Sequence, residues 1–478
     1  MTACSRKLAP TFFLGALLLS GCMTMAPQYR RPEAPVPEAL PYADTRANEE
    51  GALARWRDVF TDPKLQALIE AALQNNRDLR VATLNVEKAR ALYHVQRSEL
   101  VPSITATGGY TRQRVGPNAS TGIVGQTRQN GGAPITLIQY NVSGVVSAYE
   151  VDLFGRVKSL NKKALETYFA TREAQKAAKV ALIAETATAY FSLAADRELL
   201  SIAGDTFKSR QASLDLTEQL VDNGAGTDLD VERAKTSVES ARADAARLKA
   251  QVDRDENALR LLVGAPPPGA EDARALADIA LQRDIPAGVK SEILLGRPDV
   301  LAAEDGLKAA NANIGAARAA FFPQILLTAS AGTANAQLSD LFAPGTGVWR
   351  FAPTINLPIF AGGRNLAQLK GARVDRDIAK ANYEKAIETA FREVADALAT
   401  RQTINEQLDA TQNLAAASSK TFDLAQMRFK EGIDNYLSVL DAERADYAAR
   451  QQLVAVRLAE AENVSALYAA LGGGFDEK

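Results

Sequence analysis

The 478-residue chain has few of the side chains on which most enzymes and metalloproteins depend. One His and two Cys leave too few ligands for a protein-held zinc, iron–sulfur or haem centre. Lysine and arginine total 55 against 57 acidic residues, so the strongly basic character of nucleic-acid binders is missing. No nucleophile-elbow or phosphate-loop motif occurs either. We therefore expect no enzymatic activity, no cofactor or metal, and no nucleic-acid partner.

Two further sets of side chains suggest chemistry only at first sight. His94 stands in a helical segment without a second His or Cys nearby, so a structural or interfacial role is favoured. Asp253, Asp255 and Glu256 lack the glycine of a calcium loop. Their position in a helical segment predicts a solvated face.

Long apolar stretches are also scarce, although 47% of the residues are hydrophobic. After residue 22 no run reaches the roughly 18 residues of a membrane-spanning helix, which excludes a helical transporter but not a β-barrel. The apolar run Leu8 to Leu19 follows Arg6 and Lys7 and is too short to span a bilayer. Residues 1–21 therefore predict a signal peptide for export.

The signal ends in Leu19-Ser20-Gly21-Cys22, which resembles the bacterial lipobox. Cys22 would be acylated, with palmitate among its chains, and several chains on one residue exceed what stable anchoring needs. An ordinary secretory signal with an incidental Cys is the alternative. Met23 follows Cys22 at the position where an Asp would resemble an inner-membrane retention signal, so sorting to the outer membrane is favoured. An extended tether is expected within residues 22–61, because the segment contains prolines at 27, 32, 35, 37 and 41.

The sequence after the tether consists of two copies of one structural unit. Gly224 and Gly432 lie 208 positions apart, and other pairs share this offset. Upstream, Pro102 and Pro323 lie 221 apart, so the first copy contains 13 additional residues (221 − 208). The expected parts are a first repeat at 62–263, a linker at 264–296, a second repeat at 297–471 and a tail at 472–478.

Each copy predicts a helix, two strands, a long helix, a tight turn and a last helix. The first helix is expected over 62–100, with Asp62 as its cap and Pro63 at its first position. The long helices, about 157–221 and 365–430, contain no Pro and would each span roughly 100 Å, too long for a globular core. Many of their apolar positions are Ala, which favours a thin-walled hollow array over a solid bundle.

Four segments alternate apolar and polar residues, at about 102–113, 139–153, 324–332 and 349–360. Such alternation is typical of outer-membrane strands, although soluble sandwiches show it too. The long, polar, Gly-rich loops between the paired segments favour the interpretation as outer-membrane strands over a soluble sandwich. Four strands cannot close a barrel, and an open edge is forbidden in lipid. The chain must therefore oligomerise if these strands lie in a membrane.

This plan resembles the TolC-like outer-membrane factor family, specifically the lipoprotein branch of resistance-nodulation-division efflux systems. The resemblance covers essentially the whole mature chain. Besides the lipobox and the duplication, it rests on the strings Glu150–Arg156, Arg297–Val300, Ala309–Arg318, Leu357–Phe360, Phe391–Asp396 and Leu471–Gly474.

The resemblance implies a mainly α protein with a membrane β-barrel. Three copies would share a twelve-stranded β-barrel and a hollow α-barrel that crosses the periplasm, with the linker 264–296 in an equatorial belt. The homotrimer would be a lipid-anchored exit duct in the outer membrane. It would passively release drugs or toxic compounds supplied by a resistance-nodulation-division transporter through a periplasmic adaptor. A duct for type I protein secretion, or a lipid-anchored coiled-coil scaffold without a pore, are the alternatives.

The two tight turns between helices contain the candidate docking residues. Gly224 and Gly432 stand where glycines that end helices are expected. If the helices are periplasmic, the turns form the tips that face the inner membrane. The resemblance implies that these tips bind the adaptor, with Gly224, Gly226, Gly432 and Asn435 as the candidates.

The resemblance also implies a gate at the second tip. Leu437 and Asp441 match the family's constriction and, at positions i and i+4, share one helix face. Three Asp441 side chains around an axis would form an acidic ring, a known selectivity device. The alternative is that Asp441 pairs with Arg444 on a solvated surface.

Overall fold

The computed structural model describes residues 24–42, 55–116, 134–224, 226–266, 276–279 and 290–474. Cys22 and much of the linker 264–296 lie outside these ranges. None of the described helices is long and apolar enough to cross a membrane. In chain order the main elements are α2 (Trp56–Val59), α3 (Pro63–Asn75), α4 (Arg77–Ser98), β1 (Ile104–Val115), β2 (Ile135–Val151), α6 (Arg156–Asp222), α7 (Asp228–Val263), α8 (Pro298–Ala319), β3 (Gln324–Asn335), β4 (Gly347–Asn356), α9 (Arg364–Lys430) and α10 (Tyr436–Ala470).

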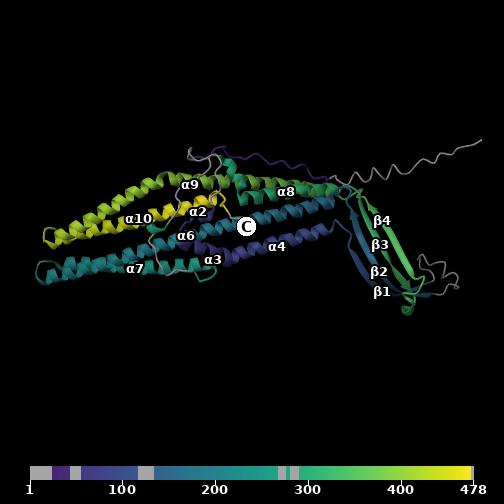
Figure 1. Cartoon of the computed structure of the whole chain (residues 1–478), viewed down its shortest axis with the longest axis horizontal. Coiled ribbons are helices and arrows are strands. Elements are labelled where there is room, and N and C mark those ends of the chain that lie inside the picture. The colour runs from purple at the N-terminus through teal and green to yellow at the C-terminus, as the bar shows by residue number, and fades with distance from the viewer. Residues whose placement is uncertain are drawn as a thin grey trace, which may run out of the picture. The chain divides into compact units, whose positions relative to one another are not determined.

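The chain forms two compact units. The first comprises residues 1–32, 87–169 and 305–380, and the second comprises residues 33–86, 170–304 and 381–478. Each unit draws on both copies of the sequence repeat, so the duplication does not coincide with the compact units. The first unit contains the sheet, and the second contains the two helical tips (Figure 1).

The sheet of the first unit is antiparallel, in the order β1-β2-β3-β4. Ile104 of β1 lies opposite Val146 of β2, and Val146 lies opposite Ala329 of β3. The first two strands come from one sequence copy and the last two from the other, so β2 and β3 join the copies. In the described chain, β1 and β4 each pair on one side only.

One row of the sheet exposes large apolar side chains. Trp349, Phe351 and Ile355 are exposed and alternate along β4, so they share a face. Strand β4 ends at Asn356, before the expected limit of residue 360. Pro358 has no N–H group to continue the ladder, which accounts for the earlier end.

An ion pair and a ring contact fix the turn from β2 into α6. The guanidinium of Arg156 lies 2.6 Å from a carboxylate oxygen of Glu150. The rings of Phe154 and Phe322 stack with centroids 4.7 Å apart, which ties this turn to the end of α8. The string Glu150–Arg156 therefore has a structural role at the junction of helix and sheet.

Residues 24–29 form an N-terminal strap beside α8. Arg318 donates a hydrogen bond to the carbonyl of Met25 over 3.0 Å, and Asn311 donates one to the carbonyl of Pro27 over 2.8 Å. Gly315 lies between these two donors, and a Cβ there would come within 2.7 Å of the Ala26 nitrogen. Glycine at 315 therefore permits the strap to lie close against the helix.

The helix expected over 62–100 is divided into α3 and α4, so that prediction was wrong. Asn76 adopts an extended conformation, and its side-chain oxygen accepts from the backbone of Leu79. Its side-chain nitrogen donates to the carbonyl of Leu262 near the end of α7 over 2.9 Å. The break therefore lies where α7 ends, and the Asn76 side chain forms hydrogen bonds with both α4 and α7. The cap at Asp62 is confirmed, since it accepts from the backbone of Lys64 and Leu65.

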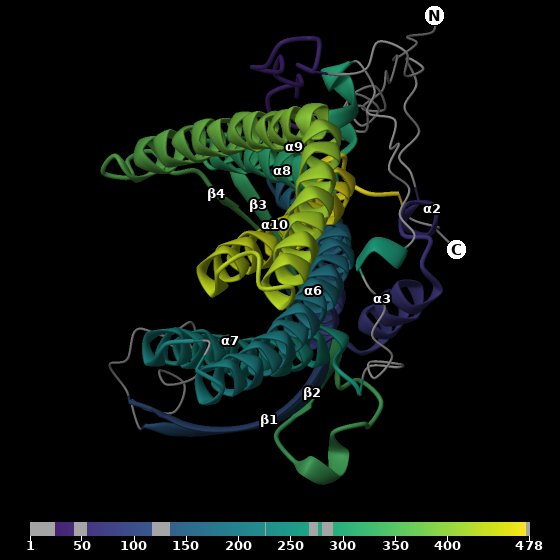
Figure 2. The same ribbon diagram turned by 90° about the vertical axis from the view of Figure 1, so that its left-hand side faces the viewer.

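The core of the second unit is aromatic and aliphatic. The Phe60 ring lies 6.4 Å from Phe191 of α6 and 5.5 Å from Tyr468 of α10, measured between centroids. All three side chains are buried, and each contributes on the order of 1.5–3 kcal/mol. Figure 2 shows α2 and α3 beside α6. A second cluster joins α3, α6 and α7 through Leu68, Leu193, Val252, Leu259 and Val263.

The strap gives a first test, in which the same substitution is made at two glycines of α8. Gly315→Ala should push the strap away from the helix, whereas nothing lies within 4 Å of a Cβ at Gly306. Trypsin cleavage after Arg30 should therefore accelerate in the first variant. Gly306→Ala should leave cleavage unchanged and stabilise α8 by up to about 1 kcal/mol. Equal cleavage rates in both variants would contradict the close contact.

Candidate functional site

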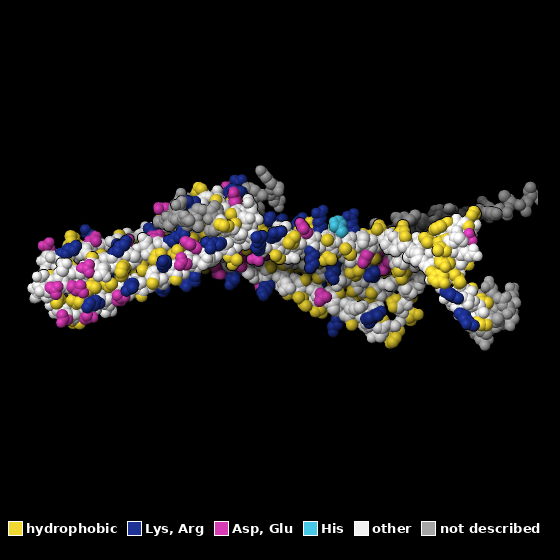
Figure 3. Space-filling view, turned by 90° about the horizontal axis from the view of Figure 1, so that it is seen from below, with side chains coloured by type: hydrophobic (Ala, Val, Ile, Leu, Met, Phe, Trp, Pro, Cys, Tyr) yellow, Lys and Arg dark blue, Asp and Glu magenta, His cyan; other side chains and the backbone are white. Residues whose placement is uncertain are grey.

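The first helical tip is built by a left-handed glycine and a threonine cap. Gly224 has a φ of 75°, and its N–H donates to the carbonyl of Val221. Thr227 starts α7, and its side chain accepts from the backbone N–H of Asp230. Gly226 serves a different purpose, because a Cβ there would lie 2.8 Å from a methyl group of Val221. Figure 3 shows acidic side chains gathered at this end of the helical unit.

The second tip repeats the first with an added ion pair. Gly432 has a φ of 72°, and Asn435 caps α10 by accepting from the backbone N–H of Ser438. Arg428 lies 2.6 Å from a carboxylate oxygen of Asp434 and holds the pKa of that carboxyl below its usual value. Asn435 therefore has a local structural role in addition to its expected role in docking.

The structure places Leu437 and Asp441 together on the exposed face of α10, one turn apart. Their neighbours Val439 and Leu440 point the other way and are buried. Arg444 is exposed as well, but no ion pair between Asp441 and Arg444 is present among the described residues. The alternative in which this pair neutralises Asp441 is therefore not supported.

A hydrophobic cluster lies beneath the two tips. Side chains of α6, α7 and α10 are buried there, and partly buried residues of α9 pack against them. The two hairpins are therefore held together near their ends by apolar contact. The buried members are Leu214, Ala234, Val238, Tyr436, Val439 and Leu440.

Next to this cluster a buried arginine of one helix contacts two others. Arg210 of α6 lies 3.4 Å from Glu443 of α10 and donates to the backbone carbonyl of Ser237 on α7 over 3.0 Å. It also lies over the ring of Tyr447, 5.7 Å from its centroid. Burial raises the pKa of Glu443, and the nearby Arg210 offsets this only in part. Removing either partner would leave a buried charge without compensation.

The residues Arg210 and Glu443 were not identified from the sequence, although a signal was present. Tyr436, Val439 and Leu440 begin an apolar stripe, and Glu443 occupies its next position at i+7. An acidic residue in an apolar stripe indicates a buried partner. Nothing in the sequence around Arg210 identifies it as that partner, because the pairing joins positions 233 residues apart (443 − 210).

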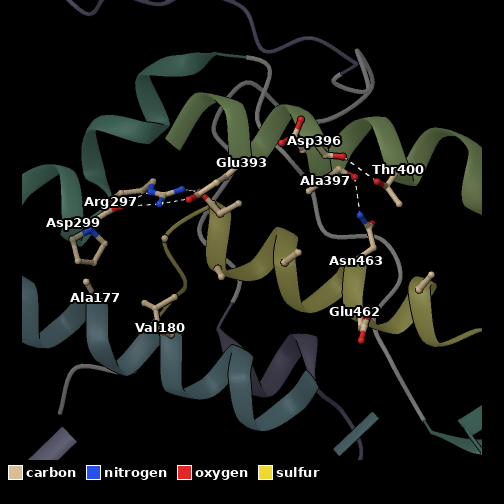
Figure 4. Close-up of a pocket in the computed structure, with 17 residues that line it drawn as sticks. Ala177, Val180, Arg297, Asp299, Glu393, Asp396, Ala397, Thr400, Glu462 and Asn463 are labelled. Carbon is tan, nitrogen blue, oxygen red and sulfur yellow. Dashed lines mark hydrogen bonds and ion pairs between the residues drawn. The ribbon is translucent and has the colours of Figure 1, made fainter. Parts of the chain in front are cut away.

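A second arginine lies beside a cavity of about 760 Å³ in the second unit (Figure 4). Arg297 lies 2.8 Å from both Asp299 and Glu393, and it also donates to the carbonyl of Ala470. It thereby joins α8, α9 and the end of α10. Burial alone would raise the pKa of Asp299, but the hydrogen bonds from Arg297 outweigh it and lower the pKa.

Asp255 and Glu256, which the sequence placed on a solvated face, are partly buried, so that expectation was wrong for these two, whereas Asp253 is exposed as expected. Glu256 lies 2.6 Å from Arg197 of α6. Burial, together with a hydrogen bond to Asp196, raises the pKa of Asp255 to about 6. Within the described ranges no three His, Cys, Asp or Glu side chains form a group that could hold a metal ion.

These features define a class of protein. In lipid, an antiparallel sheet with two open edges and an exposed apolar face cannot be complete in one chain. Paired helical hairpins with charged, capped tips accompany it. Together they are the parts of one protomer of an outer-membrane channel.

Comparison with known proteins identifies the family. Residues 68–265 and 289–473 match the family described as outer membrane efflux protein, and the chain belongs to this family. It is 45% identical to the toluene efflux pump outer membrane protein TtgC of Pseudomonas putida, with 97% of this chain and 95% of TtgC covered. It is 41% identical to the outer membrane protein OprJ of Pseudomonas aeruginosa, with 98% and 97% covered.

The solved structures agree with the family. The open state of the MtrE outer membrane channel of Neisseria gonorrhoeae is similar, with a TM-score of 0.84 and 39% identity. The match covers 94% of this chain and 98% of MtrE. The fold is therefore that of a TolC-like outer-membrane channel, with an α-barrel and a β-barrel. The protein is an outer-membrane channel of a tripartite efflux pump that extends into the periplasm and works as a trimer with an adaptor and an inner-membrane transporter.

The buried arginine gives a test of what holds the tips together. Glu443→Ala should destabilise the helices near the tips by about 3–5 kcal/mol, because Arg210 would lose its charge partner in a buried site. Glu239→Ala is the matched control, since its pair with Arg242 is exposed and should cost about 0.5 kcal/mol or less. Hydrogen exchange of α6, α7 and α10 measures the difference. Similar exchange in both variants would show that the buried pair is not needed.

Proposed function

We propose that the trimer is a passive exit duct for drugs and other toxic compounds, including apolar solvents. The proposed substrate class rests on the near full-length similarity to TtgC, whose name describes a toluene efflux pump. We infer that the transport energy comes from the partner, since the sequence contains no phosphate-loop motif with which to bind a nucleotide. A resistance-nodulation-division transporter of the inner membrane would supply the substrate.

We propose further that a membrane-fusion adaptor docks at the two tips. The left-handed glycines Gly224 and Gly432 make both turns tight and leave them without side chains at their ends. Gly226 and Asn435 set the shape of the turns that follow. An adaptor hairpin would then contact mainly backbone and the flanking acidic side chains.

The gate of the duct would lie at Leu437 and Asp441. Both are exposed although their neighbours on α10 are buried, so they point away from the core of their own protomer. Facing a shared axis, three leucines would narrow the bore and three carboxylates would favour cations.

Removing the proposed acidic ring gives a direct test. Asp441→Ala should raise single-channel conductance in planar bilayers, because the shorter alanine side chains widen the narrowest point, and weaken cation selectivity, because three charges leave it. Glu239→Ala, which removes an exposed carboxylate from α7, should change neither quantity. Unchanged conductance and selectivity in Asp441→Ala would exclude this residue from the constriction.

The lipid anchor at Cys22 is tested separately. Cys22→Ser should abolish labelling by radioactive palmitate. The variant should still require detergent, because the apolar face of the sheet would remain in contact with lipid. A Cys22→Ser protein that is monomeric and soluble without detergent would contradict the channel and favour a periplasmic scaffold.

A further inference from the structure

The first unit has two open sides. One side consists of the edge strand β1 and the helix α4 that precedes it, and the other consists of the edge strand β4 and the helix α9 that follows it. Both sides expose large apolar side chains that the described part of the chain leaves uncovered. The shared barrel brings these two sides together in neighbouring copies, so the inference rests on the trimer of the proposed function.

On the β1 side four large apolar residues are exposed within a short stretch of the chain. Leu92 and Val95 are exposed and lie three positions apart on one face of α4, and Val101 follows in the connection to β1. Ile104 begins the strand and is exposed as well. We refer to Leu92, Val95, Val101 and Ile104 as the α4–β1 patch.

The α4–β1 patch is unlike a surface that faces lipid. Charged residues such as Arg90 and Arg97 stand between the apolar positions of helix α4. Only Leu79 of its 22 residues is buried within the chain. An apolar stripe between charges on an otherwise exposed helix is typical of a helix that packs against protein.

On the β4 side two side chains are almost fully exposed. Ile359 is 93% exposed and Phe360 is 91% exposed, and both lie between the end of β4 and the start of α9. Adjacent large apolar residues with this exposure are typical of a surface that contacts protein or membrane. We call the pair Ile359–Phe360 the hook.

The topology determines what the hook meets. Strand β1 starts directly after α4, and β4 ends directly before α9, so both helix-side ends lie at the same edge of the sheet. Strands β1 and β4 run in opposite directions, as antiparallel closure between copies requires. The residues that follow β4 in one copy therefore lie beside those that precede β1 in the next.

We propose that the hook of each protomer packs onto the α4–β1 patch of the next copy. It joins the copies where the β-barrel meets the α-barrel, next to the hydrogen bonds of the shared sheet. Three such contacts, one per seam, close the ring. Because the contact is apolar, it adds to the backbone ladder between the strands and is independent of it.

The contact can be tested by placing a photoreactive benzoylphenylalanine at position 360 of the full-length protein. Irradiation of the purified trimer in detergent should join neighbouring copies, with the adduct mapped to residues 92–104 by mass spectrometry. The same residue at position 342 is the control. Phe342 is 76% exposed but lies in the β3–β4 loop, at the other end of the strands, and should give no such adduct.

Two outcomes would overturn the hook. An intact trimer without adducts from position 360 would show that this side chain meets lipid or detergent. Adducts that map outside residues 92–104 would place the hook elsewhere. In both cases native electrophoresis would still show a trimer, so the proposed exit duct would not be contradicted. Loss of the trimer in the unsubstituted protein would instead contradict the proposed function.

A substitution measures the strength of the contact. Phe360→Asp should lower the stability of the trimer about tenfold or more, because each seam loses a buried aromatic ring and gains a charge. Phe342→Asp introduces the same charge outside the seam and should have little effect. Equal trimer stability in the two variants would contradict the proposal.

Discussion

The unpaired backbone groups of β1 and β4 are the constraint on which the rest of the structure depends. Each strand carries a row of N–H and C=O groups that the described chain does not satisfy. In lipid such groups have no water to bind, and each unsatisfied group costs several kcal/mol. Sharing the sheet between copies removes every edge at once. Closure of the sheet between copies is therefore a requirement of the backbone, and large apolar residues are exposed along the same two sides.

The same constraint shapes the helical unit. Helices that follow the strands around a ring cannot form a solid core, so the chain stabilises them by narrow seams and a few buried ties. Arg297 joins three helices through two carboxylates and a carbonyl, and Arg210 joins three helices near the tips through one carboxylate and a carbonyl. A guanidinium can supply several donors in one plane, which makes arginine suited to this task. Such ties cost desolvation energy, as the raised pKa of Glu443 indicates.

Local features of the sequence predicted a large part of this architecture. The glycines 224 and 432 ended their helices in the left-handed conformation, as expected from their position after a long periodic segment. Asp62 capped α3 as expected. The spacing of Leu437 and Asp441 predicted that they share one face of the helix, but only the structure shows that this face is exposed. The break at Asn76 was missed, because Asn is tolerated within helices and only its contact with Leu262 of α7 reveals the interruption.

By itself, the sequence determined most of the elements and the duplication. These properties depend on residues close together in the chain, whose propensities and spacing act before any tertiary contact forms. Only the tertiary structure decided which charges are buried, as with Arg210 and Glu443, and which apolar residues stay exposed, as with Ile359 and Phe360. Burial is a property of neighbours, and these neighbours come from distant parts of the chain or, as we propose for the hook, from another copy. Local sequence therefore predicted the helices and strands, whereas packing determined which charges are buried and which apolar surfaces need a partner.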